Sequence, residues 1–294
     1  MSEFSIGQCA TLACFFEATA PKPGNVHRGA DFEDLTYPDL VTSAIVIGPM
    51  MENACQRRLG ETVLVAVRAT RQAVGTNSNL GTILLLAPLA AVPRDEPLAS
   101  GVGRVLDRLG TDDARLVYEA IRLARPGGLS RVGEADVAGE PPPDLIAAMR
   151  LAADRDLVAR QYSNRFREVL DEVAPAIQSG LDRGWDTNGA IVHAQLTIMS
   201  RFPDSLIARK CGTETAQRAA DHAAEVLRAG TPLDESFWQA ADDLDFWLRS
   251  DGHRRNPGTT ADLIATGLFA LLRDDKMKVG SRQSATDTNQ AGFL

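Results

Sequence analysis

The sequence predicts an all-α protein, folded as a single bundle of about ten to twelve helices. Two observations favour this class. Ala, Leu and Arg are abundant, while aromatic residues make up only 5% of the 294 residues, and sheets depend on aromatic and β-branched side chains. Apolar residues also recur at helical spacing along almost the whole chain. We assign residues 1–273 to one domain and predict a polar, disordered tail over residues 274–294.

Two apolar runs near the beginning admit a second interpretation. Residues 63–67 (VLVAV) and 83–86 (ILLL) have the composition of buried strands. Each lies within a longer helix-compatible segment without a hairpin signal, so we predict two buried helices. Residues 144–173 and 235–250 continue the helical periodicity, the second with its aspartates on the outer side. For the Gly- and Pro-rich residues 125–143 we predict a surface loop, because the flanking helices belong to one bundle.

Charge and hydropathy argue against several classes of protein. The formal net charge is −8 and the chain has no Lys/Arg block, whereas a nucleic-acid binder presents a basic face. The first twenty residues lack a basic n-region, and no apolar stretch approaches the roughly 20 residues of a membrane span. We therefore expect a cytoplasmic protein that acts on small molecules. The four cysteines have no metal or disulfide spacing, so we predict reduced, buried thiols.

Residues 21–34 (PKPGNVHRGADFED) form the first of four polar segments that adjoin expected helix starts. If Asp31 and Asp34 lie on a starting helix, their i, i+3 spacing puts both carboxylates on one face. Such a pair suits Mg²⁺, which takes one or two carboxylates and lets substrate phosphates fill other positions. The alternative is a solvated acidic first turn, which the helix dipole favours.

Residues 75–82 (GTNSNLGT) form the second polar segment. Asn77 and Asn79 are poor residues inside a helix and good ones at a cap or in a left-handed turn. The segment is not a phosphate-binding Walker A loop, because five residues separate its glycines and no Lys follows. An ordinary turn between two buried helices is the alternative to a binding loop.

Residues 202–214 (FPDSLIARKCGTE) form the third polar segment. Asp204 can cap a helix that begins at the next residues. Arg209 and Lys210 add adjacent cations, which are suited to a phosphate group. The alternative is a solvated basic end of a helix.

Residues 255–262 (RNPGTTAD) form the fourth polar segment, directly before an apolar helix. Thr259 and Asp262 have the spacing of a capping box. A capping box does not account for Arg255 and Asn256 just upstream of the same helix start. Free N–H groups, a positive dipole end and guanidinium groups together form an anion site. We expect this segment to be both a cap and a phosphate site.

Taken in order, these segments resemble the triphosphoribosyl-dephospho-CoA synthase family. The chain carries Glu17 before PKPGNV, then GTNSNLG, PDSLIARKCGTE and NPGTTADL, and the resemblance spans about residues 10–272. Four ordered motifs are more specific than any single one. The loop KPGNVHRGADFED departs from the common form of the family. It resembles a second subgroup, with PGNV and DFED, from organisms that use methanopterin-type one-carbon coenzymes.

The resemblance implies an Mg²⁺-dependent transferase that moves a phosphorylated ribose from a nucleotide to an alcohol. ATP would be the donor, with adenine leaving, and 3'-dephospho-CoA the acceptor. The alternatives are phosphoribosyl transfer to a pterin-type acceptor, an ADP-ribosyl-type hydrolase and a non-catalytic nucleotide-binding protein. Breaking the bond at ribose C1 builds oxocarbenium character that carboxylates stabilise, and a carboxylate can deprotonate the incoming hydroxyl. A homodimer is one open oligomeric state.

The resemblance also assigns roles within these segments. We expect Glu17, Asp31 and Asp34 to be catalytic, with Glu17 as a candidate base and the two aspartates also binding Mg²⁺. We expect cations to hold the phosphates and amides to orient ribose, from the set Lys22, Arg209, Lys210, Arg255, Asn77, Asn79 and Asn256. The remaining candidates for substrate binding are Asn25, Thr259, Thr260 and Asp262.

Overall fold

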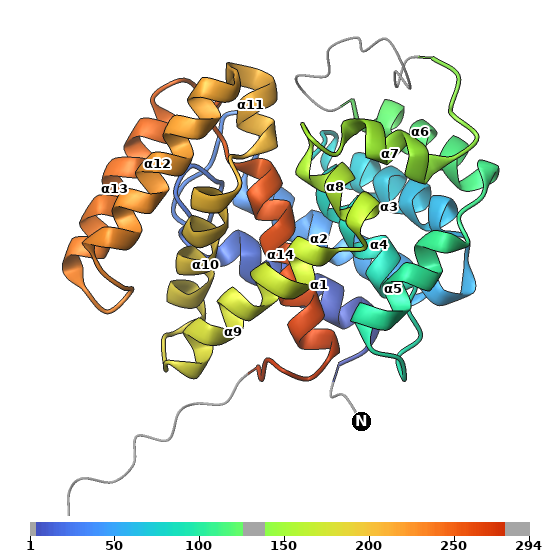
Figure 1. Ribbon diagram of the computed structural model, residues 1–294, viewed down its shortest axis with the longest axis horizontal. Helices are drawn as coiled ribbons and strands as arrows, with labels where there is room; N and C mark the ends of the chain where they lie inside the picture. The colour runs from blue at the N-terminus through green and yellow to red at the C-terminus, as the bar shows by residue number, and fades with distance from the viewer. Residues whose placement is uncertain (1–3, 126–138, 280–294) are drawn as a thin grey trace, which may run out of the picture.

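The computed structural model describes residues 4–125 and 139–279, and it confirms the predicted all-α class (Figure 1). These residues form fourteen α-helices, a 3-10 helix η1 and a π-helix η2, with no strand among them. The elements are α1 (Ile6–Thr19), α2 (Tyr37–Glu52), η1 (Ala54–Gln56), α3 (Leu59–Val74), α4 (Leu80–Ala90), α5 (Leu98–Asp107), α6 (Thr111–Ala124), α7 (Leu145–Ala152), α8 (Leu157–Asn164), η2 (Val169–Val173), α9 (Ala174–Asp182), α10 (Thr187–Arg201), α11 (Ser205–Cys211), α12 (Thr213–Ala229), α13 (Glu235–Arg249) and α14 (Gly258–Arg273).

Local sequence signals account for several helix starts. Ser5 caps α1 through a capping box with Gln8, and Thr36 caps α2 in the same way. The apolar runs at residues 63–67 and 83–86 lie within α3 and α4. The prediction of two buried helices is therefore confirmed.

The described residues contain more helices than the ten to twelve predicted. Residues 144–173 were expected to be one periodic segment, but a new helix, α8, begins within them. Asp156 caps this helix by accepting hydrogen bonds from Val158 N and Ala159 N at 2.8 and 3.2 Å. Arg165 then ends α8 in a left-handed conformation, before η2. Apolar spacing continues across such breaks, because a cap or a left-handed residue changes the backbone without changing which residues are apolar.

Helix α14 is the centre of the fold (Figure 1). It packs against α1, α4, α9 and α10, which come from distant parts of the chain. Every residue from 263 to 273 is buried, as in a core helix that is enclosed on all sides. Thr259 and Thr260, in its first turn, are 5% and 0% exposed. Other segments therefore surround the N-terminus of this helix.

The four cysteines are free, and the prediction that all are buried is wrong for two of them, since Cys55 is exposed and Cys211 is partly exposed. Cys9 and Cys14 are buried, but Cys55 is exposed because it lies in the short surface helix η1. Residues 274–279, which the prediction assigned to a disordered tail, belong to the described part of the chain. Met277 is only 6% exposed and packs against the hydrophobic core, so an apolar anchor holds the residues after α14.

Two predictions fall on residues outside the described part of the chain. The surface loop expected at residues 125–143 consists mostly of residues 126–138, and the rest of the tail is residues 280–294. Among the described residues, no helix combines the length and the hydropathy needed to cross a bilayer.

Candidate active site

Hydrogen bonds bring the four polar segments together around the start of α14. Each bond joins residues that are distant in sequence, and together they link the loop before α2, the start of α4, the start of α11 and the start of α14. The three pairs are Thr260 N with Asp204 Oδ2 at 2.7 Å, Asn25 Nδ2 with Asn256 Oδ1 at 2.7 Å, and Thr82 Oγ1 with Asp262 Oδ1 at 2.6 Å. The four motifs of the sequence thus meet at one place in the fold.

Asp204 caps two helices at once. Its Oδ1 accepts hydrogen bonds from Leu206 N and Ile207 N at 2.8 and 3.0 Å, which is the predicted cap of α11. Its Oδ2 accepts from the backbone N and the hydroxyl of Thr260 at 2.7 and 2.8 Å. Burial raises the pKa of Asp204, and these hydrogen bonds oppose the rise. Asp204 is therefore a structural link between α11 and α14.

The capping box predicted between Thr259 and Asp262 is wrong, because Asp204 already binds the first turn of α14. The Asp262 carboxylate instead contacts the first turn of α4, where Thr82 donates to it. A Cβ on Gly81 would lie 2.0 Å from Asp262 Oδ2. Only glycine leaves room for a carboxylate at this point, so the second and fourth motifs are fitted to each other.

Asp262 has a strongly perturbed acidity. Burial raises its pKa to about 7; the hydrogen bond from Thr82 opposes this rise, and the negative charges of Glu17 and Asp204 add to it. The residue nevertheless keeps some exposure to solvent. A carboxylate that is partly protonated near neutral pH and within reach of solvent can take a proton from a substrate.

Glu17 and Lys22 form a buried ion pair next to this carboxylate. Lys22 Nζ lies 2.9 Å from Glu17 Oε1, and their side chains are 0% and 14% exposed. Nζ also donates to the backbone carbonyl of Glu17. The phosphate-binding role predicted for Lys22 does not agree with this geometry, because its ammonium group has no exposed area. Lys22 instead holds Glu17 in place.

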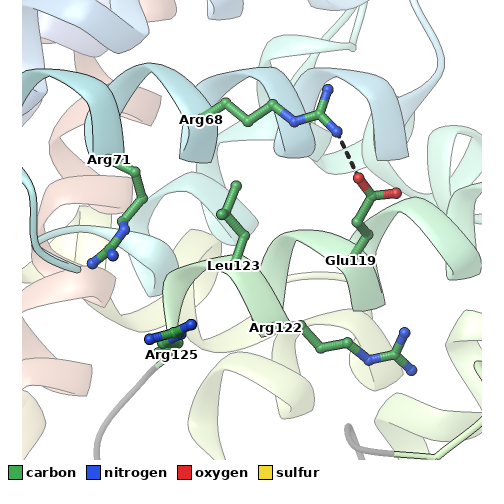
Figure 2. Close-up of a pocket in the computed structure, with 6 residues that line it drawn as sticks. All are labelled: Arg68, Arg71, Glu119, Arg122, Leu123 and Arg125. Carbon is green, nitrogen blue, oxygen red and sulfur yellow. Dashed lines mark hydrogen bonds and ion pairs between the residues drawn. The ribbon is translucent and has the colours of Figure 1, made fainter.

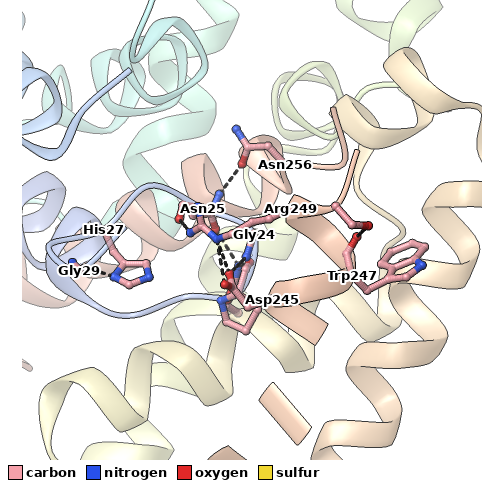
Figure 3. A network of polar contacts seen from close by, with 11 residues as sticks. Gly24, Asn25, His27, Gly29, Asp245, Trp247, Arg249 and Asn256 are labelled. Carbon is pink, nitrogen blue, oxygen red and sulfur yellow. Dashed lines mark hydrogen bonds and ion pairs between the residues drawn. The ribbon is translucent and has the colours of Figure 1, made fainter. Parts of the chain in front are cut away.

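Figure 3 shows the polar network that fastens the first segment to α10, α13 and the start of α14. The Asn25 amide is buried, and its Oδ1 accepts from Gln195 Nε2 at 2.8 Å. Asp245 Oδ1 accepts from Gly24 N at 2.7 Å, and Arg249 Nε donates to the same carboxylate at 2.8 Å. Arg249 also donates to the backbone carbonyl of Asn25. The predicted candidate Asn25 is thus a structural member of the site.

The sequence analysis missed three members of this network. Asp245 was expected on the solvated side of its helix. Arg249 was not among the predicted site residues. Gln195 is fully buried inside an apolar helix, and a buried amide in such a place requires a hydrogen-bond partner. A glutamine in an apolar helix could therefore have been recognised from the sequence as a residue that needs a partner. The sequence does not show which residue that partner is.

Asp31 and Asp34 do not lie on a helix, so the prediction that they share a helical face is wrong. They belong to the loop before α2, where Asp31 Oδ1 accepts from Tyr37 N at 2.7 Å. The Asp34 side chain is 73% exposed, and its Oδ1 lies 3.4 Å from His253 Nε2. Asp31 uses one oxygen to help begin α2, because the first N–H groups of a helix have no partner within it.

No group of three or more His, Cys, Asp or Glu side chains suited to a metal occurs among the described residues. The two predicted ligands, Asp31 and Asp34, lie on the loop before α2, and Asp34 is largely exposed. Such a set fits Mg²⁺ and not a closed structural site, since Mg²⁺ commonly uses one or two carboxylates together with water and substrate phosphates.

Two of the predicted phosphate-binding cations have internal partners. Arg209 forms an ion pair with Asp156 at 3.2 Å. Arg255 donates to the Trp247 carbonyl at 2.9 Å, and its guanidinium lies 4.5 Å from the centre of the Trp247 ring. In contrast, the Lys210 side chain has no ion pair or hydrogen bond within the described ranges, although its backbone carbonyl accepts from Arg254. These arginines hold α11 and the loop before α14 in position.

The second segment supplies one open hydrogen-bond donor. Asn77 Oδ1 accepts from Leu80 N at 3.2 Å and so caps the start of α4. Asn79 is 9% exposed, and its Nδ2 has no hydrogen-bond partner among the residues that the structure describes. A buried, unpaired amide at a helix start needs an explanation. A ligand oxygen would provide the missing acceptor.

The described residues form an all-helical protein in which carboxylates, amide groups and helix starts gather around one core helix. The family follows from comparison with known proteins. The chain belongs to the family described as ATP:dephospho-CoA triphosphoribosyl transferase (CitG), whose model matches residues 3–281.

Individual relatives carry the same description. A protein of Azotobacter vinelandii named "Probable 2-(5''-triphosphoribosyl)-3'-dephosphocoenzyme-A synthase" is 24% identical over 254 residues, covering 85% of this chain and 84% of its own length. One of the same name from Malonomonas rubra is 30% identical over 113 residues, 37% of this chain and 34% of its own. A crystal structure from Archaeoglobus fulgidus, assigned to triphosphoribosyl-dephospho-coA synthase, matches with a TM-score of 0.61 and 28% identity, covering 79% of this chain and 97% of that one.

Proposed function

We propose that this protein transfers the triphosphoribosyl group of ATP to a hydroxyl group of 3'-dephospho-CoA and releases adenine. In this reaction the C1–N bond of the donor breaks, a C1–O bond forms, and the proton of the hydroxyl group ends on adenine. The family match supports the reaction class. The observation that carries the assignment of the site is the set of hydrogen bonds that joins the start of α14 to the other three polar segments.

Asp262 is the strongest candidate for the general base. Its pKa of about 7 lets it be ionised in a large fraction of molecules at neutral pH and still be a good proton acceptor. Thr82 fixes the orientation of the carboxylate through a bond of 2.6 Å. This assignment moves the role of base from Glu17, as the sequence suggested, to a residue expected only to bind substrate.

In the proposal, Glu17 stabilises the transition state instead of acting as the base. Oxocarbenium character develops at C1 as adenine leaves, and a nearby negative charge lowers the energy of that state. The ion pair with Lys22 keeps the Glu17 carboxylate in one position. The open Nδ2 of Asn79 can donate to a ribose hydroxyl group.

Mg²⁺ is part of the proposal and would be held by Asp31 and Asp34 together with substrate phosphates. The metal would supply positive charge that neutralises the phosphate oxygens. The first segment is fastened beside the start of α14 by the bond between Asn25 and Asn256. That link supports the proposal, because Asn25 and the two aspartates belong to the same polar segment.

The reaction is tested by incubating the protein with ATP, Mg²⁺ and 3'-dephospho-CoA. We expect free adenine and a coupled product whose mass equals that of the acceptor plus the triphosphoribosyl unit, both followed by chromatography and mass spectrometry. Adenine release without any acceptor would instead indicate a hydrolase. Product formation with a pterin-type alcohol and not with dephospho-CoA would overturn the choice of acceptor.

A further inference from the structure

A basic groove of about 400 Å³ lies between α3 and α6, apart from the residues of the candidate active site. The two helices run side by side, and Figure 2 shows arginines from both of them around the apolar side chain of Leu123. The groove is lined by Arg68, Arg71, Glu119, Arg122, Leu123 and Arg125. Four guanidinium groups and one carboxylate meet here in a chain whose formal net charge is −8.

Two of the arginines that line this groove have no counter-charge among the described residues. Arg68 donates to Glu119 at 2.6 Å and uses the single carboxylate of the lining. The side chains of Arg71 and Arg125 have no hydrogen-bond or ion-pair partner among the described residues. Figure 2 shows both side chains at the end of the groove where α3 and α6 stop. Two neighbouring guanidinium groups repel each other unless an anion lies between them.

The open end of the groove adjoins the second polar segment. Arg71 lies in the last turn of α3, and the chain turns at Gly75 directly into the loop that contains Asn77 and Asn79. The chain therefore leads directly from the cationic end of the groove into the loop that carries Asn79. Within the candidate active site, by contrast, Lys22, Arg209 and Arg255 already have internal partners.

We propose that the groove between α3 and α6 binds the phosphoanhydride chain of a nucleotide substrate. Arg71 and Arg125 are the ligands, because a planar guanidinium group binds two phosphate oxygens at once and stays charged at all relevant pH values. The identity of the substrate rests on the proposed function, in which both ATP and dephospho-CoA carry such a chain. Binding of the phosphoanhydride group itself does not depend on turnover.

The test measures binding to the full chain by calorimetry, with inorganic triphosphate, ATP, dephospho-CoA and adenosine as separate ligands. We compare the wild type with the double variant Arg71→Gln/Arg125→Gln. Arg108→Gln is the matched control, since Arg108 is exposed at the end of α5 and does not line the groove. We expect triphosphate to bind the double variant at least about 10-fold more weakly, because each charge-assisted hydrogen bond contributes strongly to affinity. Adenosine binding stays unchanged.

The titrations with ATP and with dephospho-CoA show which substrate supplies the phosphate group that binds in the groove. Weaker binding of ATP alone assigns the groove to the donor, and weaker binding of dephospho-CoA alone assigns it to the acceptor. In steady-state assays the corresponding KM rises more than kcat falls, because the lost contacts are made equally in the ground state and the transition state.

One result overturns the proposal. If the arginines only offset the carbonyl dipoles at the ends of α3 and α6, the double variant melts at a lower temperature and binds triphosphate as tightly as the wild type does. Failure of the proposed function looks different. In that case no transfer product forms with either acceptor, while triphosphate still binds in a manner that depends on Arg71 and Arg125.

Discussion

Two groups of carboxylates lie beside the start of α14, and their surroundings differ sharply. Glu17, Asp204 and Asp262 are enclosed by α1, α4, α11 and α14, and each has a fixed partner within the protein. Asp31 and Asp34 stand on the loop before α2, where the Asp34 side chain is 73% exposed. Within the enclosed group the pKa values of Asp204 and Asp262 are raised, and burial is the largest cause for both.

This difference separates roles that the sequence could not separate. A carboxylate with a raised pKa in a confined place is suited to proton transfer. An exposed carboxylate on a loop is suited to a hydrated cation that arrives with its substrate. The five acids are the same two residue types, so the division of labour comes from burial and partners. The following four changes test that division, beginning with the largest expected effect.

Asp262→Asn removes the proposed base, and we expect kcat to fall by about 10³- to 10⁴-fold, which is the upper range for general-base catalysis. The wild-type rate should rise with pH through about 7, as the carboxylate ionises. The measurement is adenine release between pH 5.5 and 9. A variant that keeps its activity and the same pH profile would exclude Asp262 as the base.

The same variant should be more stable than the wild type at high pH. Because the folded state raises the pKa of Asp262 from 3.8 to about 7, the wild type loses stability as pH rises between these values. Asparagine has no such loss. We expect thermal unfolding to show a gain of about 2–4 kcal/mol at pH 8 and almost none at pH 4, the full value being reduced by the partial exposure of the side chain.

Glu17→Gln tests the ion pair of the enclosed group. It leaves the fully buried ammonium group of Lys22 without its counter-charge, and we expect a loss of about 3–5 kcal/mol in the free energy of unfolding. Chemical denaturation measures this loss. The paired variant Glu17→Gln/Lys22→Met removes both charges and should regain most of the stability without regaining activity. If it regained full activity, the Glu17 carboxylate would have no part in the chemistry.

Asp34→Asn tests the exposed group. Stability should change by less than about 0.5 kcal/mol, because the side chain is largely in water. Turnover should be lost at limiting Mg²⁺, by about 100-fold if the proposed metal ligand is removed. Titration of activity with Mg²⁺ measures the effect, and Glu33→Gln on the same loop is the control. If activity depended on Mg²⁺ equally in the two variants, Asp34 would not be a metal ligand.

Thr82→Val is the smallest of the four changes. It removes the hydroxyl group that donates to Asp262, and since that hydrogen bond lowers the pKa of Asp262, the pKa should rise. The rising limb of the rate profile then moves to higher pH, and the rate at pH 6.5 falls by about 10-fold or less. Thr82→Ser keeps the hydroxyl group and should restore the profile of the wild type. If the pH profile of the valine variant did not shift, the Thr82 hydroxyl would have no effect on the pKa of the catalytic carboxylate.

Much of the local structure could be predicted from the sequence. Helical spacing gave the class, and Asp204 was recognised as a cap because side-chain capping is a contact between near neighbours. The capping box at Thr259 failed because a distant carboxylate competes for the same N–H groups. In the same way, Asp245 looked like a solvated residue until the loop at Gly24 was placed against it.

The order of the four motifs and their residue types determined the family and many of the candidate side chains of the site, and apolar periodicity determined the helical class. Tertiary structure alone decided which carboxylates are enclosed, that Lys22 neutralises Glu17, and that Gly81 makes room for Asp262. The physical reason is that burial and electrostatic coupling depend on distances between residues far apart in the chain. Periodicity and capping are properties of neighbours, and a sequence read in order records only those directly.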